Sequence, residues 1–131
     1  MRETGESAER RVAAGQAALY GMTGIWPLIH MASFEAVTGP KRERWLVRTV
    51  GVLVAGIGAT LALAAWRRSF GPEIRLLGGA SAAGLAAVDL WYAGVRRRIS
   101  PVYLADAAAE IALGVAWAVF ARRGARGEGQ R

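Results

Sequence analysis

The chain has 131 residues, of which 53% are hydrophobic and 21% charged, and its formal net charge is +7. That length suffices for one domain, and the absence of cysteine excludes disulfides, thiol catalysis and thiolate metal sites. Since His30 is the only histidine and no glycine-rich phosphate loop occurs, the sequence predicts no metal site and no cofactor.

The charged residues gather in short clusters, and four long apolar runs lie between these clusters. A helix needs roughly 20 residues to cross the hydrocarbon core of a bilayer, and each run is close to that length. Arginines at the ends of the runs are typical of anchors at lipid headgroups, whereas nucleic-acid binding needs one contiguous basic patch. We therefore expect an all-α integral membrane protein that contacts the lipid bilayer and binds no nucleic acid. The runs, with the acids inside them, are residues 12–34, 49–66, 76–95 (Asp89) and 99–121 (Asp106 and Glu110).

The first predicted element is a long helix over about residues 12–38, preceded by a polar lead-in of residues 1–11. Gly39 and Pro40 end this helix, and Pro27 predicts a kink near its middle. We expect the lead-in to be frayed or to lie at the membrane interface.

Three further helices are predicted, followed by a polar tail. Pro72 and Pro101 suit the first turn of the last two helices, because the missing N–H of proline would have no helical partner there. Such short connections make neighbouring helices antiparallel, so residues 12–123 are expected to form one four-helix up-down-up-down bundle. Because its first half is barely hydrophobic, the third helix is the weakest span, and the alternative places it in the membrane interface. The predicted ranges are 42–66, 73–96 and 101–122 for the helices and 124–131 for the tail.

Polar side chains from all four predicted helices converge on the half of the bundle away from the chain termini. At a rise of about 1.5 Å per residue, Glu110 lies about 14 Å inside the boundary at Pro101, close to the midplane of the membrane. Asp106 and Glu110 are four residues apart, so they share one helix face. The candidate ligand- or proton-binding residues are Asp89, Asp106, Glu110, His30, Glu35, Arg48, Tyr92 and Tyr103.

Ionisable groups inside a membrane are costly and usually face a bundle interior or a water-filled cavity, which makes these residues candidates for function. Asp106 and Glu110 would repel each other if both were ionised, so we expect a proton, a nearby arginine or a bound cation to compensate. The alternative interpretation is a purely structural network, in which Arg48 bridges Glu35 to Asp106 or Asp89.

Three functions fit this pattern. The first is a membrane protein that binds or transports a small cationic or polar ligand, or protons, in the polar pocket. The second is an intramembrane enzyme in which Asp106 and Glu110 act as acid and base on a lipid-like substrate. The third is an accessory subunit that packs into a larger membrane complex, or a homodimer, through helix faces rich in small residues. The pattern favours the first function, without catalysis.

The expected location is a bacterial cytoplasmic membrane with both termini on one side. Lysine and arginine number ten on the side with the termini and seven on the other side, which favours cytoplasmic termini. Two sets of segments, residues 34–41 with 45–51 and residues 100–106 with Glu110, resemble an uncharacterised family of small bacterial four-helix integral membrane proteins. The resemblance implies the fold and the membrane, but no activity, substrate or site.

Overall fold

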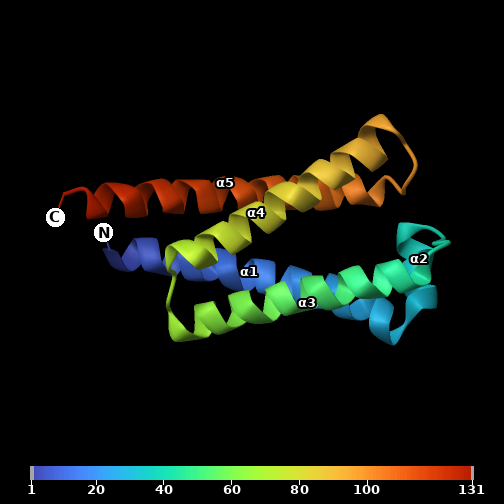
Figure 1. The fold of residues 1–131 in the computed structure, drawn as a ribbon, viewed down its shortest axis with the longest axis horizontal. Helices are drawn as coiled ribbons and strands as arrows, with labels where there is room; N and C mark the ends of the chain where they lie inside the picture. The colour runs from blue at the N-terminus through green and yellow to red at the C-terminus, as the bar shows by residue number, and fades with distance from the viewer. Residues whose placement is uncertain (1, 131) are drawn as a thin grey trace.

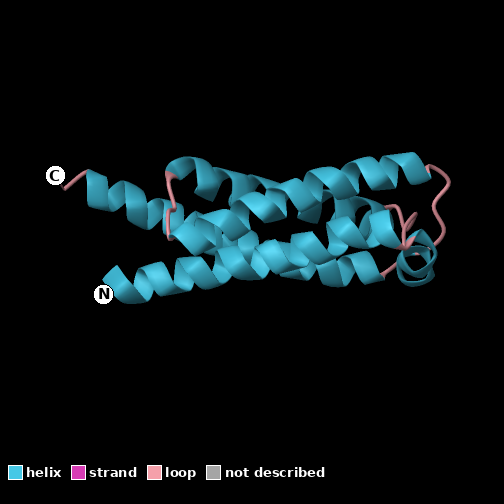
Figure 2. Ribbon diagram, turned by 90° about the horizontal axis from the view of Figure 1, so that it is seen from below, coloured by secondary structure: helices cyan, strands magenta, loops and turns pink. Residues whose placement is uncertain are grey.

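The computed structural model of the chain describes residues 2–130, and nearly all of them are helical (Figure 2). No β-strand occurs in this described part, so the predicted all-α class is confirmed. The elements are the α-helices α1 (Arg2–Ile29), α2 (Met31–Thr38), α3 (Arg44–Arg67), α4 (Pro72–Asp89) and α5 (Val102–Glu128), with the π-helix η1 (Leu90–Val95) after α4.

Two helix pairs make up the fold, and each pair is packed more closely within itself than against the other pair. α1 lies along α3, and α4 lies along α5 (Figure 1). The first turns of α1 and the last turns of α5 lie at one end of the molecule, here called the terminal end, and α2 lies at the opposite end, the α2 end. α4 starts beside the last turn of α3 and then crosses away from it, so the two pairs separate toward the α2 end.

Three helical segments are long and apolar enough to cross a membrane, namely Arg44–Arg67, Pro72–Val95 and Val102–Glu128. α1 is not among them, because residues such as Gln16 and Pro27 lower its mean hydropathy. Length and composition therefore support three of the four predicted spans, including the one over residues 73–96 that the sequence made the weakest.

The structure corrects the predicted start of the first helix. α1 begins at Arg2, so the predicted lead-in is helical wherever the structure describes it. A contact with α4 explains why these residues are helical, since the Arg75 Nε donates a hydrogen bond to the Glu9 Oε1 at 2.7 Å. Glu9 is buried at this contact, which attaches the first turns of α1 to a helix 66 residues later in the chain.

The structure also corrects the predicted continuity of residues 12–38, because the helix breaks at His30, three residues after Pro27. The helix runs through Pro27 to Ile29, and the His30 N–H still donates to the Trp26 oxygen at 2.9 Å. His30 has φ −146° and ψ 83°, which lie outside the helical region, and its Nδ1 accepts a hydrogen bond from the Ser33 N–H at 3.1 Å. This bond caps α2, which therefore leaves the axis of α1 and lies across the end of the fold (Figure 1).

The last two helices differ from their predicted ranges as well. α5 continues to Glu128 and so includes part of the predicted polar tail. The chain after Asp89 widens into the π-helix η1, in which the Arg96 N–H donates to the Trp91 oxygen at 2.8 Å. Single π-helical turns often occur next to functional sites.

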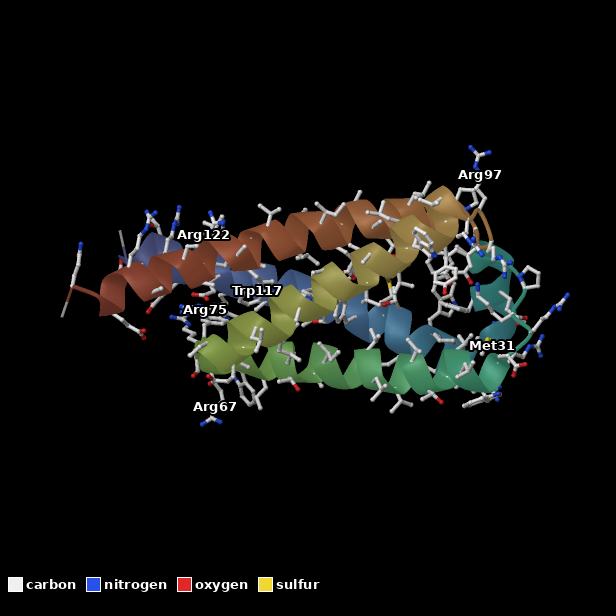
Figure 3. All side chains as sticks on the ribbon, turned by 45° about the horizontal axis from the view of Figure 1, so that its top comes forward. Met31, Arg67, Arg75, Arg97, Trp117 and Arg122 are labelled. Atoms are coloured by element: carbon white, nitrogen blue, oxygen red, sulfur yellow. The ribbon has the colours of Figure 1, made fainter. Side chains whose placement is uncertain are left out.

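The terminal end of the fold is filled by side chains around Trp117, which lies among the helices in Figure 3. Trp117 is 1% exposed and forms a buried cluster with Leu61 and Ala65. Its Nε1 donates to the Gln16 Oε1 at 2.6 Å, and the Gln16 Nε2 donates to the Gly78 oxygen at 3.0 Å. This buried cluster joins α1, α3 and α5 at the terminal end.

Candidate functional site

A cavity of about 400 Å³ lies in the half of the fold nearer α2, where the two helix pairs separate. Residues from α1, α2, α3, α4 and α5 line it, so segments from the whole chain build one site. Most of the lining is apolar. Its polar residues are Thr23, Thr38, Tyr103 and three acids.

The three acids lie on the wall that α4 and α5 form. Asp106 and Glu110 are one turn apart on α5, and Asp89 is the last residue of α4. Glu110 is 1% exposed and Asp89 is 5% exposed, while Asp106 is half-buried. The carboxyl groups of Asp89 and Asp106 lie close enough to interact. Together with Tyr103, these acids bring four of the predicted candidates into one cavity.

One carboxylate oxygen on this wall lacks a partner. The Oδ2 of Asp89 is buried and accepts no hydrogen bond, and it is the one buried side-chain atom of this kind in the described chain. Leaving a buried polar atom unpaired costs about 1–3 kcal/mol, and more for a charged group. No lysine, arginine or histidine of residues 3–130 lines the cavity, so the acids have no basic partner there. A ligand with a positive charge or an N–H donor would complete the site.

Tyr20 belongs to the site although the sequence analysis did not select it. Its hydroxyl donates a hydrogen bond to the Glu110 Oε2 at 2.8 Å, and Tyr20 is almost fully buried. The bond joins α1 to α5 across 90 residues of sequence. A signal did exist, because Tyr20 shares a helix face with Thr23 and Pro27, which both line the cavity.

Replacing Tyr20 with phenylalanine is expected to lower the free energy of unfolding by about 1–3 kcal/mol, because a buried carboxyl oxygen loses its donor while the ring is kept. Titration of the purified protein from a mild detergent into dodecyl sulfate, followed by circular dichroism, measures this change. Tyr92→Phe is the matched control, since the Tyr92 side chain is exposed. Equal losses in the two variants would contradict the assigned bond.

Three aromatic rings line the same cavity, from Trp26, Phe34 and Tyr103. The rings of Trp26 and Phe34 meet edge to face with centroids 5.6 Å apart. The Lys41 Nζ lies 5.0 Å from the centroid of the Tyr103 ring and donates to the Thr38 oxygen at 2.9 Å. Although Lys41 does not line the cavity, its ammonium group lies on the aromatic face of a residue that does, which is a favourable arrangement for a cation.

Four of the predicted candidates lie outside the cavity. His30 caps α2 and is exposed, and its ring nitrogen bonds to the Ser33 hydroxyl at 2.7 Å. Tyr92 is exposed on η1, and Arg48 is exposed on α3. Glu35 lies near the connection between α2 and α3, where it contacts Arg44.

The predicted bridge from Arg48 to Glu35 is replaced by a pair one helical turn earlier. Glu35 accepts hydrogen bonds from the Arg44 Nε at 3.0 Å and from the Arg44 Nη2 at 2.9 Å. The Arg44 guanidinium lowers the pKa of the Glu35 carboxyl from its ordinary value. α3 begins at Arg44, and the turn after Gly39 brings this first residue opposite Glu35, while Arg48 points outward. The structural network proposed for the acids therefore receives no arginine.

A second hollow, of about 540 Å³, runs along α4 and α5 on a different face of the fold. Small residues such as Gly79, Ala83 and Ala121 line it, together with Arg75, which is already paired with Glu9. Within residues 3–130, no buried side-chain atom of this hollow lacks a partner.

Comparison with known protein families, with curated proteins and with solved structures found no match. The site is therefore interpreted from its own geometry, which combines three acids, three aromatic rings and an apolar rim. In the part of the chain that the structure describes, no three acidic or histidine side chains gather closely enough to hold a metal ion.

Proposed function

We propose that this chain is an integral membrane protein, a four-helix up-down-up-down bundle whose intramembrane cavity binds a small organic cation. The support for the membrane comes from the outward-facing side chains. Many large apolar residues are exposed, such as Leu53 on α3, Leu76 on α4 and Val115 on α5. Apolar exposure of this extent in a monomer marks a surface that contacts lipid or another protein.

The positions of the arginines also support helices that cross a bilayer from one end of the fold to the other. Figure 3 shows Arg67 and Arg122 extending outward toward the terminal end and Arg97 at the α2 end. Such positions suit contacts with lipid headgroups on the two surfaces of a membrane. The expressed chain is expected to stay in the membrane pellet after an alkaline carbonate wash, as judged by immunoblot. Release into the supernatant would contradict the proposal.

The single observation that carries cation binding is the unpartnered Asp89 Oδ2 in a cavity with two further acids and no basic residue. An ionised carboxylate in such a place needs compensation, because burial of an unpaired charge is costly. A cation in the cavity supplies it through electrostatic attraction to the carboxylates.

The aromatic rings favour an ammonium group as the cation. Trp26, Phe34 and Tyr103 line the space beside the acids, and ammonium groups bind well to aromatic faces. The contact between Lys41 and Tyr103 illustrates this preference within the chain itself. A ligand without a positive charge would leave both the rings and the Asp89 oxygen without their preferred partner.

Binding of tetramethylammonium tests this proposal. Equilibrium dialysis of the radiolabelled cation against the protein in lipid nanodiscs is expected to show saturable binding, with empty nanodiscs as the blank. Asp89→Asn should lower the affinity about tenfold or more, since it removes one charged contact without changing the size of the side chain. Glu73→Gln is the matched control, because Glu73 is exposed in the first turn of α4 and does not line the cavity. Absence of saturable binding, or equal losses in both variants, would contradict cation binding.

A further inference from the structure

We infer that the ligand is a single-chain amphiphile, with an ammonium headgroup at Asp89 and an alkyl chain that passes between α3 and α4 into the bilayer. The inference rests on the proposed cation binding and adds the chemical class of the ligand and its route. Two observations carry it: the polarity gradient in the cavity and the position of its opening.

The cavity changes from polar to apolar between its floor and its rim. Asp89 and Glu110 are buried at the floor, and the residues around the opening are half-exposed aliphatic side chains. Leu46 and Val50 of α3 are 44% and 50% exposed, and Val102 of α5 is 40% exposed. A ligand that fills such a space needs a charged end and an apolar end.

The opening lies on the side of the fold rather than at its end. α4 separates from α3 toward the α2 end (Figure 1), and the two helices pack against each other far less than each packs against its own partner. Leu46 and Val50 line the cavity from α3, and Leu85 lines it from α4. Both helices are long and apolar enough to span a membrane, so an opening between them faces acyl chains.

An alkyl chain in the lateral opening remains in surroundings as apolar as the bilayer it came from. The free energy of moving the chain from the bilayer into the opening is therefore close to zero. The ammonium headgroup in addition makes favourable contacts with the acids and the aromatic rings. Chains longer than the cavity are accepted for the same reason, since the excess length stays among the acyl chains. A closed aqueous pocket of about 400 Å³ would reject them.

Photolabelling with dodecyltrimethylammonium that carries a diazirine at the end of its chain tests the inference. In nanodiscs, labelled peptides are expected from residues 46–54 of α3 and 85–95 of α4 and η1, and excess tetramethylammonium should compete the label away. Val50→Trp, which fills the opening, should reduce this competed labelling about tenfold or more, in line with the cost of overfilling a packed site. Val52→Trp is the matched control, because Val52 lies outside the cavity on the same helix.

The outcomes separate this inference from the proposal beneath it. Competed labelling that depends on Val50 and is lost in Asp89→Asn supports the amphiphile and its route. If tetramethylammonium binds but the long-chain probe gives no competed label, the lateral route is overturned and cation binding stands. If tetramethylammonium itself does not bind, both are overturned. An equal effect of Val50→Trp and Val52→Trp also overturns the route.

Discussion

Replacing Trp117 with alanine is expected to lower the free energy of unfolding by about 3–5 kcal/mol, the largest loss for any single side chain of this protein. Trp117 is the largest fully buried side chain among those that the structure describes. Its removal leaves a void between α1, α3 and α5, whose lining atoms lose their contacts. The Gln16 Oε1 also loses its donor, because the Trp117 Nε1 is gone.

Two further variants separate packing from hydrogen bonding in this result. Trp117→Phe keeps most of the ring and is expected to lose only about 1–3 kcal/mol, chiefly through the unpaired Gln16 oxygen. Trp66→Ala is the matched control, since Trp66 is 79% exposed on α3 and leaves no void. Unfolding in dodecyl sulfate, followed by circular dichroism, measures all three. A loss in Trp66→Ala as large as in Trp117→Ala would contradict the assigned core.

Replacing Gly24 with alanine is expected to give the second largest loss, about 1–3 kcal/mol or more, because the contact between α1 and α3 has no space for a methyl group. A Cβ at Gly24 would lie 2.6 Å from the Gly51 oxygen and 2.7 Å from the Ala55 nitrogen. Both neighbours are backbone atoms, so no side chain can rotate away, and the two helices must move apart.

Gly21→Ala provides the control on the same helix. A Cβ at Gly21 would meet nothing within 4 Å, so alanine there is expected to stabilise the helix by up to about 1 kcal/mol through its higher helix propensity. Gly24→Ala is expected to lower the stability and Gly21→Ala to raise it. A general effect of alanine on helix stability would shift both in the same direction, so the comparison excludes it. Equal stability changes in Gly24→Ala and Gly21→Ala would show that the helices do not meet at Gly24.

The acids of the candidate site illustrate what spacing along a helix can predict. Asp106 and Glu110 had to share a face because four residues make about one helical turn. Asp89 could be placed near them because short connections fix the direction of each helix, and with it the depth of each residue. The structure brings all three to one cavity.

Glu35, Arg48 and His30 illustrate what spacing alone leaves open. Arg44 instead of Arg48 pairs with Glu35, because the first turn of α3 starts where the connecting loop ends. His30 was expected inside a continuous helix, yet it caps α2 after the break that follows Pro27. Each difference arises at a helix end, where a shift of one turn changes which side chains meet, and local sequence signals fix such ends poorly.

The sequence by itself determined the helical class, the approximate helix positions and the face on which the deepest acids lie. These features follow from the 3.6-residue period of the helix and from where charges interrupt apolar runs, both of which are local properties of the chain. Only the tertiary structure decided that Tyr20 donates to Glu110, that the Asp89 Oδ2 has no partner and that the cavity opens beside α3. Those features depend on how the two helix pairs sit against each other, and such contacts join residues far apart in the sequence.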